Sequence, residues 1–179
     1  MEDKEQDQDD YQEDHMEAAF TLAREALGAG EVPVGCVMVV EGRVVGRGRN
    51  TVNLTKNATR HAEINAIDEI EEAAKQQGVA SSSLHPRVSV YCNVEPCIMC
   101  AAALAKLGVA AVYFGCSNDK FGGCGSVGPS LLEGRVARVR GGVRAQEAID
   151  LLKGFYDQEN PFAPCPKVKG VRVQKTINI

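Results

Sequence analysis

The stretch VSVYCNVEPCIMC at residues 88–100 predicts a buried strand that leads directly into a helix. Its valine-rich first half, 88–93, is typical of a strand. Pro96 favours a helix start, because the N–H that proline lacks would have no partner in the first turn. Cys97 and Cys100 are three residues apart, so both sulfurs lie on one face of that turn. The free amides and the positive helix end favour thiolates, and we expect a pair of ligands for a soft divalent metal.

Helices and strands alternate along the rest of the chain. A continuous run of apolar residues predicts a strand, and an apolar period of three to four residues predicts a helix. We expect helices at 16–27, 61–77, 96–108 and 144–156, and strands at 34–40, 44–50, 88–93, 109–115 and 135–140. This order implies crossover connections and a parallel or mixed sheet that is covered on both faces. Ligands of such sheets lie where strands lead into helices.

His61 is the expected third metal ligand, because two thiolates leave zinc under-coordinated and catalytic zinc sites usually have three protein ligands and a water. Glu63 lies two residues further on, a spacing that lets both side chains approach one metal only at a helix entrance. An apolar helical period begins directly after Glu63. The combination His-x-Glu with Pro-Cys-x-x-Cys is the known pattern of zinc deaminases that act on nucleobases.

Two simpler interpretations compete with a catalytic site. A Cys-x-x-Cys pair is often a redox pair or half of a structural zinc site, and Cys116 and Cys124 could complete such a site with four cysteines. The proline, the His61 to Glu63 spacing and the absence of a second Cys-x-x-Cys in the sequence favour the catalytic site.

Zinc held by two thiolates and an imidazole can lower the pKa of its water to about 7. Glu63 is then free to take the water proton, deliver it to a ring nitrogen and later protonate departing ammonia. Its alternative role is that of an ordinary acid in a first helical turn. Asn50, at the end of the second strand, is the candidate for binding the base, although asparagine is also common in turns.

Composition indicates one domain with two tails. The chain has 179 residues and a net charge of −4. Residues 1–17 hold nine acids and one lysine, whereas residues 18–179 hold 15 acids and 19 bases. We expect a disordered acidic tail at 1–15, a folded domain at 16–160 and a basic tail at 161–179.

No apolar run approaches the length of a membrane span, and the acid-rich N-terminus does not look like a secretory signal. Seven cysteines without such a signal suit a reducing compartment, so we expect the cytoplasm or the nucleus.

The chain resembles the tRNA-specific adenosine deaminases of the cytidine deaminase superfamily over about residues 16–160. The motifs that carry the resemblance are VPVG at 32–35, GRN at 48–50, ATRHAE at 58–63 and VEPCIMCA at 94–101. Within this region, FGGCGS at 121–126 and FYDQENP at 155–161 are similar to the catalytic subunits of the eukaryotic wobble-adenosine deaminases.

This resemblance implies an α/β fold, a three-layer α/β/α sandwich around a five-stranded mixed sheet. It implies conversion of adenosine to inosine at the wobble position of tRNA, by a heterodimer with a related non-catalytic deaminase subunit. His61, Cys97 and Cys100 match the zinc ligands of the family, Glu63 matches its proton shuttle, and Asn50 matches a residue of its base pocket.

Two alternatives remain open at the level of sequence. The segment HAEINAI at 61–67 is also similar to the deoxycytidylate deaminases, in which an asparagine at the position of Asn65 is common. A deoxycytidylate or guanine deaminase that acts on a free nucleotide or base is therefore the second hypothesis. A non-catalytic, zinc-stabilised RNA-binding subunit is the third, and the presence of Glu63 argues against it.

Four basic residues near the C-terminus are expected RNA contacts or part of a solvated tail: Lys167, Lys169, Arg172 and Lys175.

Overall fold

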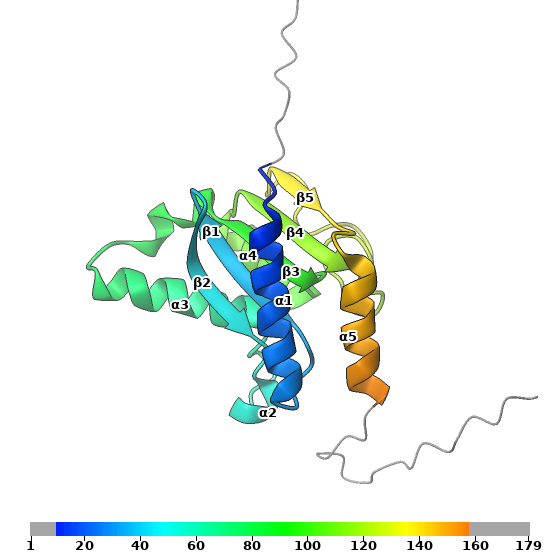
Figure 1. The fold of residues 1–179 in the computed structure, drawn as a ribbon. Coiled ribbons are helices and arrows are strands. Elements are labelled where there is room, and N and C mark those ends of the chain that lie inside the picture. The colour runs from blue at the N-terminus through cyan, green and yellow to red at the C-terminus, as the bar shows by residue number, and fades with distance from the viewer. Residues whose placement is uncertain (1–9, 158–179) are drawn as a thin grey trace, which may run out of the picture.

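The computed structural model describes residues 10–157 (Figure 1). The helices are α1 (Glu13–Gly28), α2 (Val52–Thr55), α3 (Ala62–Gln76), α4 (Ile98–Leu107) and α5 (Ala145–Asp157), and two short 3₁₀ turns lie at Ser81–Ser83 and His85–Arg87. The strands are β1 (Gly35–Val40), β2 (Arg43–Arg49), β3 (Ser89–Val94), β4 (Ala111–Cys116) and β5 (Arg138–Arg140).

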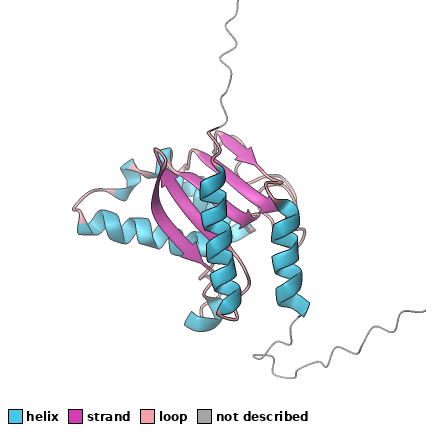
Figure 2. Cartoon of the chain, viewed as in Figure 1, coloured by secondary structure: helices cyan, strands magenta, loops and turns pink. Residues whose placement is uncertain are grey.

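The five strands form one mixed sheet in the order β2-β1-β3-β4-β5. Strand β1 is antiparallel to both β2 and β3, whereas β3, β4 and β5 run parallel to one another. Helices α1 and α5 cover one face, and α3 and α4 cover the other (Figures 1 and 2). The expected three-layer α/β/α sandwich around a five-stranded mixed sheet is confirmed.

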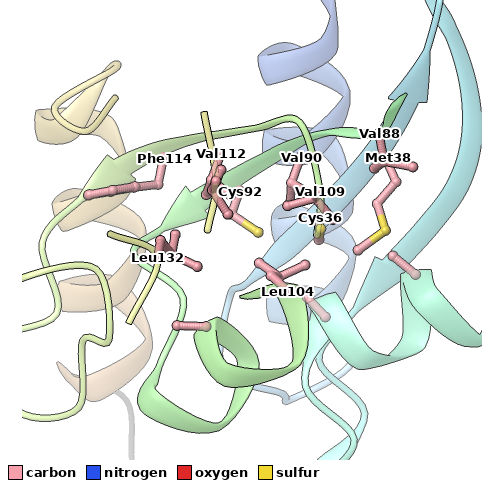
Figure 3. Packing of buried hydrophobic residues seen from close by; sticks show 14 of the residues in the cluster. Cys36, Met38, Val88, Val90, Cys92, Leu104, Val109, Val112, Phe114 and Leu132 are labelled. Atoms are coloured by element: carbon pink, nitrogen blue, oxygen red, sulfur yellow. The ribbon is translucent and has the colours of Figure 1, made fainter. Parts of the chain in front are cut away.

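Two apolar cores hold the layers together, because alternate residues of each strand point to opposite faces. On one face Met38, Val90 and Val112 pack against Leu104 of α4, with Cys36 and Cys92 in the same cluster (Figure 3). The other face packs on α1 and α5. Both faces of β1 and β4 are buried, which explains their continuous apolar sequences.

Several element boundaries differ from the expected ones. Helix α4 begins at Ile98 rather than Pro96, because the first helical hydrogen bond runs from Ala101 N to Cys97 O. Strand β5 covers only the last three of the six residues expected at 135–140. The segment 51–60, between the expected strand at 44–50 and the expected helix at 61–77, contains the short helix α2.

Helix α1 begins at Glu13, inside the segment 1–15 that was expected to be a tail. The rest of that tail, from residue 1 to 9, and the basic tail from residue 161 onward lie outside the described residues. Within residues 10–157, no helix combines the length and the hydropathy that a membrane span requires.

Candidate metal centre and active site

His61, Cys97 and Cys100 meet where two helices begin. His61 caps the N-terminus of α3 in an extended conformation, and Cys97 does the same for α4. His61 Nδ1 lies 3.4 Å from Cys97 Sγ and 3.7 Å from Cys100 Sγ. The expected place of His61 at a helix entrance is therefore confirmed, although α3 begins one residue after the expected start at 61. Because His61 is the N-cap, Glu63 in the first turn can lie near it.

The spacing of these three side chains fits zinc. Bonds of about 2.3 Å to sulfur and about 2.0 Å to nitrogen at a tetrahedral angle separate the two ligand atoms by about 3.5 Å. The two observed nitrogen–sulfur distances, 3.4 and 3.7 Å, lie on either side of this value. The residues present therefore fit a zinc ion, which His61, Cys97 and Cys100 would hold.

The alternative site with four cysteines is not supported. In the part of the chain that the structure describes, the group able to hold a metal consists of His61, Cys97 and Cys100. Neither Cys116 nor Cys124 belongs to it. Three ligands are the number that leaves a fourth position for water.

The two cysteines differ in acidity. Hydrogen bonds from the Cys100 thiol and from His61 lower the pKa of Cys97 to about 4. The neighbouring Cys97 sulfur and burial raise the pKa of Cys100. The Cys97 thiolate in turn raises the pKa of His61. The first thiolate thus forms readily, which prepares the site to exchange protons for a metal.

Glu63 lies in the first turn of α3 and is only 3 % exposed. Burial raises the pKa of its carboxyl group, because the apolar surroundings disfavour the charged form. A raised pKa makes a carboxylate a stronger proton acceptor, which suits a group that has to accept protons and pass them on.

A cavity of about 680 Å³ opens over these residues. Glu63, His61 and Cys97 line it together with Asn50, and further lining residues are Lys120, Phe121, Leu152 and Tyr156. Phe121 is 62 % exposed and Tyr156 is 59 % exposed. The volume is in the range of small-molecule sites.

Asn50 is buried in the cavity wall and is held by Glu31. Its Nδ2 donates to Glu31 Oε2 at 3.2 Å, and the same carboxylate accepts from the backbone N–H groups of Asn53 and Leu54. A carboxylate only accepts, so the amide nitrogen of Asn50 has to face Glu31. Glu31 is not among the residues predicted from the sequence, although an acid directly before the apolar run at 32–40 is a signal that could have indicated it.

The comparisons with known proteins agree with this geometry. The family model for the cytidine and deoxycytidylate deaminase zinc-binding region matches residues 9–116. A Xenopus tropicalis protein named tRNA-specific adenosine deaminase 2 is 49 % identical over 159 residues, which cover 86 % of this chain and 94 % of the relative. The chain belongs to the tRNA-specific adenosine deaminases, within this zinc-binding family.

More distant members of the tRNA adenosine deaminases extend the similarity. The Schizosaccharomyces pombe protein named tRNA-specific adenosine deaminase subunit tad2 is 44 % identical over 170 residues, 93 % of this chain and 42 % of the relative. A solved structure from studies of A-to-I editing by tRNA:A34 deaminases at the wobble position superimposes with a TM-score of 0.69 at 31 % identity. It covers 79 % of this chain and 100 % of the solved one.

A guanine deaminase from Nitrosomonas europaea shares the fold, with a TM-score of 0.62 at 21 % identity, covering 79 % of this chain and 82 % of the solved one. At that identity the likeness concerns the fold alone. The resemblance to tRNA-specific adenosine deaminases and the expectation of zinc are confirmed.

Proposed function

We propose that this chain catalyses the zinc-dependent hydrolytic deamination of adenosine to inosine at the wobble position of tRNA anticodons. The observation that carries the proposal is the convergence of His61, Cys97 and Cys100 at zinc-ligand spacing, at the wall of a cavity that His61, Cys97 and buried Glu63 line. Membership in the tRNA-specific adenosine deaminases supports the substrate. The wobble position is supported by the tRNA:A34 deaminase structure.

Glu63 and Asn50 have different roles in the proposed reaction. When bound, zinc activates a water molecule at neutral pH. Glu63 takes one proton from the attacking water and passes it to a ring nitrogen of adenine. It then takes the remaining hydroxyl proton of the adduct and delivers it to the leaving amino group, which departs as ammonia. Asn50, fixed by Glu31, orients the base through its amide. An anticodon loop is a suitable substrate, since its bases leave the stack at low energetic cost.

The proposal includes a partner and a location. The partner is a related non-catalytic deaminase subunit in a heterodimer, as the sequence resemblance implies, and the fission yeast relative is itself named a subunit. The cysteines described as free, among them the two proposed ligands, suit the reducing cytoplasm or nucleus.

The test is inosine formation in tRNA by the zinc-loaded chain, alone and with the candidate partner. The same preparation is offered deoxycytidylate and guanine, and ammonia release is followed. We expect inosine in tRNA and no ammonia from the two small substrates. Ammonia from either small substrate, with unmodified tRNA, would replace the proposal by its free-nucleotide alternative.

The expected RNA contacts of the basic tail can be tested by truncation. Deleting residues 165–179 removes Lys167, Lys169, Arg172 and Lys175. We expect tRNA affinity to fall by about tenfold at physiological salt, with unchanged zinc content, because each lost phosphate contact weakens binding. Filter binding across a salt series measures this, and a truncated chain with full tRNA affinity would remove the tail from the proposal.

Changing Glu31 to Gln tests the support of Asn50. The glutamine can turn an N–H toward the Asn50 amide and the two backbone donors, so the base-contacting side chain loses its fixed orientation. We expect kcat/KM on tRNA to fall by about tenfold at unchanged zinc content. The exposed Glu25→Gln is the matched control, and equal kinetics for both variants would mean that Glu31 does not act through Asn50.

A further inference from the structure

Glu95 is a second buried acid beside the metal ligands. It follows β3 directly, precedes Pro96 and is 2 % exposed. It is not part of the group that could hold a metal. The reaction steps proposed for Glu63 and Asn50 do not involve Glu95.

The carboxylate of Glu95 is surrounded by donors from one loop. Asn118 N donates to Oε2 at 2.8 Å, and Cys124 N donates to Oε1 at 2.9 Å. Ser126 donates twice, from its backbone N at 3.3 Å and from its hydroxyl group. All these donors lie in the segment 117–126 that follows β4, which we call the Glu95 loop.

The backbone of the Glu95 loop fits closely around this carboxylate. A Cβ atom added at Gly122 would lie 2.3 Å from Glu95 Oε2, so only glycine leaves room for the carboxylate there. Two backbone hydrogen bonds tie the same loop to the start of α4: Ile98 N to Phe121 O and Gly123 N to Pro96 O. The loop is thus fixed relative to Cys97.

The Glu95 loop also forms one wall of the cavity. Its residues Ser117, Asn118, Lys120 and Phe121 line the opening. Phe121 is largely exposed there and Lys120 is exposed as well. An aromatic ring and a cation at the mouth suit stacking on a base and contact with a phosphate.

We propose that Glu95 is a positioning residue for the deaminase reaction. It acts through the backbone of the Glu95 loop, which it holds in the shape that places Lys120 and Phe121 around the target nucleotide. Glu95 lines the cavity but is outside the group of candidate metal ligands, and its carboxylate oxygens accept from the Glu95 loop. Its effect therefore falls on substrate binding more than on the chemical step. The kinetic part of this inference rests on the proposed function.

Hydrogen exchange of the zinc-loaded full chain tests the structural part without any assay of activity. In Glu95→Gln, an N–H₂ group replaces one accepting oxygen and faces backbone donors. We expect the amides of Asn118, Cys124 and Ser126 to exchange about tenfold faster, while those of α1 and β1 keep their rates. Unchanged exchange in the loop would overturn the proposal, as would equally faster exchange throughout the chain.

Kinetics on tRNA test the functional part. For Glu95→Gln we expect KM to rise about tenfold and kcat to fall less than about threefold, at one zinc per chain. The exposed Glu133→Gln should behave as the wild type. Wild-type kinetics for Glu95→Gln would refute the positioning role, whereas an inactive wild type would refute the proposed function instead.

Ser126→Ala covers the case in which Glu95→Gln does not fold. It removes one of the four donated hydrogen bonds and keeps the carboxylate. We expect a rise in KM of about threefold and faster exchange confined to the Glu95 loop. The exposed Ser82→Ala is its control. Equal KM and equal loop exchange in the two serine variants would contradict the proposal.

Discussion

Glu63→Gln should lower the rate of inosine formation by about 10³-fold while zinc stays bound, because a positioned general acid–base group contributes about 10²–10⁴-fold. Glutamine has nearly the volume of glutamate and fits the same buried place in the first turn of α3. It cannot accept the proton of the attacking water. The proton transfers to the ring nitrogen and to ammonia are then both lost.

The unfolding temperature of Glu63→Gln distinguishes a loss of catalysis from a loss of the folded structure. Burial already raises the pKa of Glu63, which means that the folded protein disfavours the charged carboxylate. A neutral amide avoids that cost, so the unfolding temperature of Glu63→Gln should equal or exceed that of the wild type. The exposed Glu72→Gln on the same helix is the matched control. Activity within threefold of the wild type in Glu63→Gln would remove the glutamate from the mechanism.

Cys97→Ser should lower zinc affinity by more than about 10²-fold, because changing a residue that merely supports a ligand already costs about 10–100-fold. Of the two cysteine ligands, Cys97 loses its proton more readily, since hydrogen bonds lower its pKa to about 4. A serine hydroxyl stays protonated at neutral pH and is a poor zinc ligand. Inosine formation should fall below detection together with the metal.

Cys124→Ser is the control for the loss of zinc. Cys124 is half-buried in the Glu95 loop and lies outside the candidate ligand group. Its serine variant should keep one zinc per chain, measured by metal analysis after dialysis against a weak chelator. Loss of zinc from Cys124→Ser, or full retention in Cys97→Ser, would show that the ligand set has been assigned incorrectly.

The candidate metal site could be predicted from sequence because its spacing is local. Cys97 and Cys100 lie within one helical turn, and the two-residue step from His61 to Glu63 has meaning only at a helix entrance. The exact start of α4 could not be predicted. Pro96 is a good first helical residue, yet its carbonyl oxygen bonds Gly123 N of a distant loop.

The roles of Glu31 and Glu95 could not be predicted from the sequence, because their hydrogen-bond partners are distant along the chain. Glu31 bonds residues 19 to 23 positions away, and Glu95 bonds residues 23 to 31 positions away. No periodic pattern marks such partners, because they come together only when the loops fold over the strand ends. The same holds for the sheet order, in which β1 lies between β2 and β3. Alternating strands and helices predict a mixed sheet but leave the order of its strands open.

X-ray absorption at the zinc edge of the zinc-loaded chain tests most directly whether three side chains hold a metal with one open position. Two sulfur neighbours at about 2.3 Å and two nitrogen or oxygen neighbours at about 2.0–2.1 Å are the predicted shell. The two sulfurs are those of Cys97 and Cys100, and one of the lighter neighbours is His61. A shell of three or four sulfurs would contradict the catalytic site and restore a structural one.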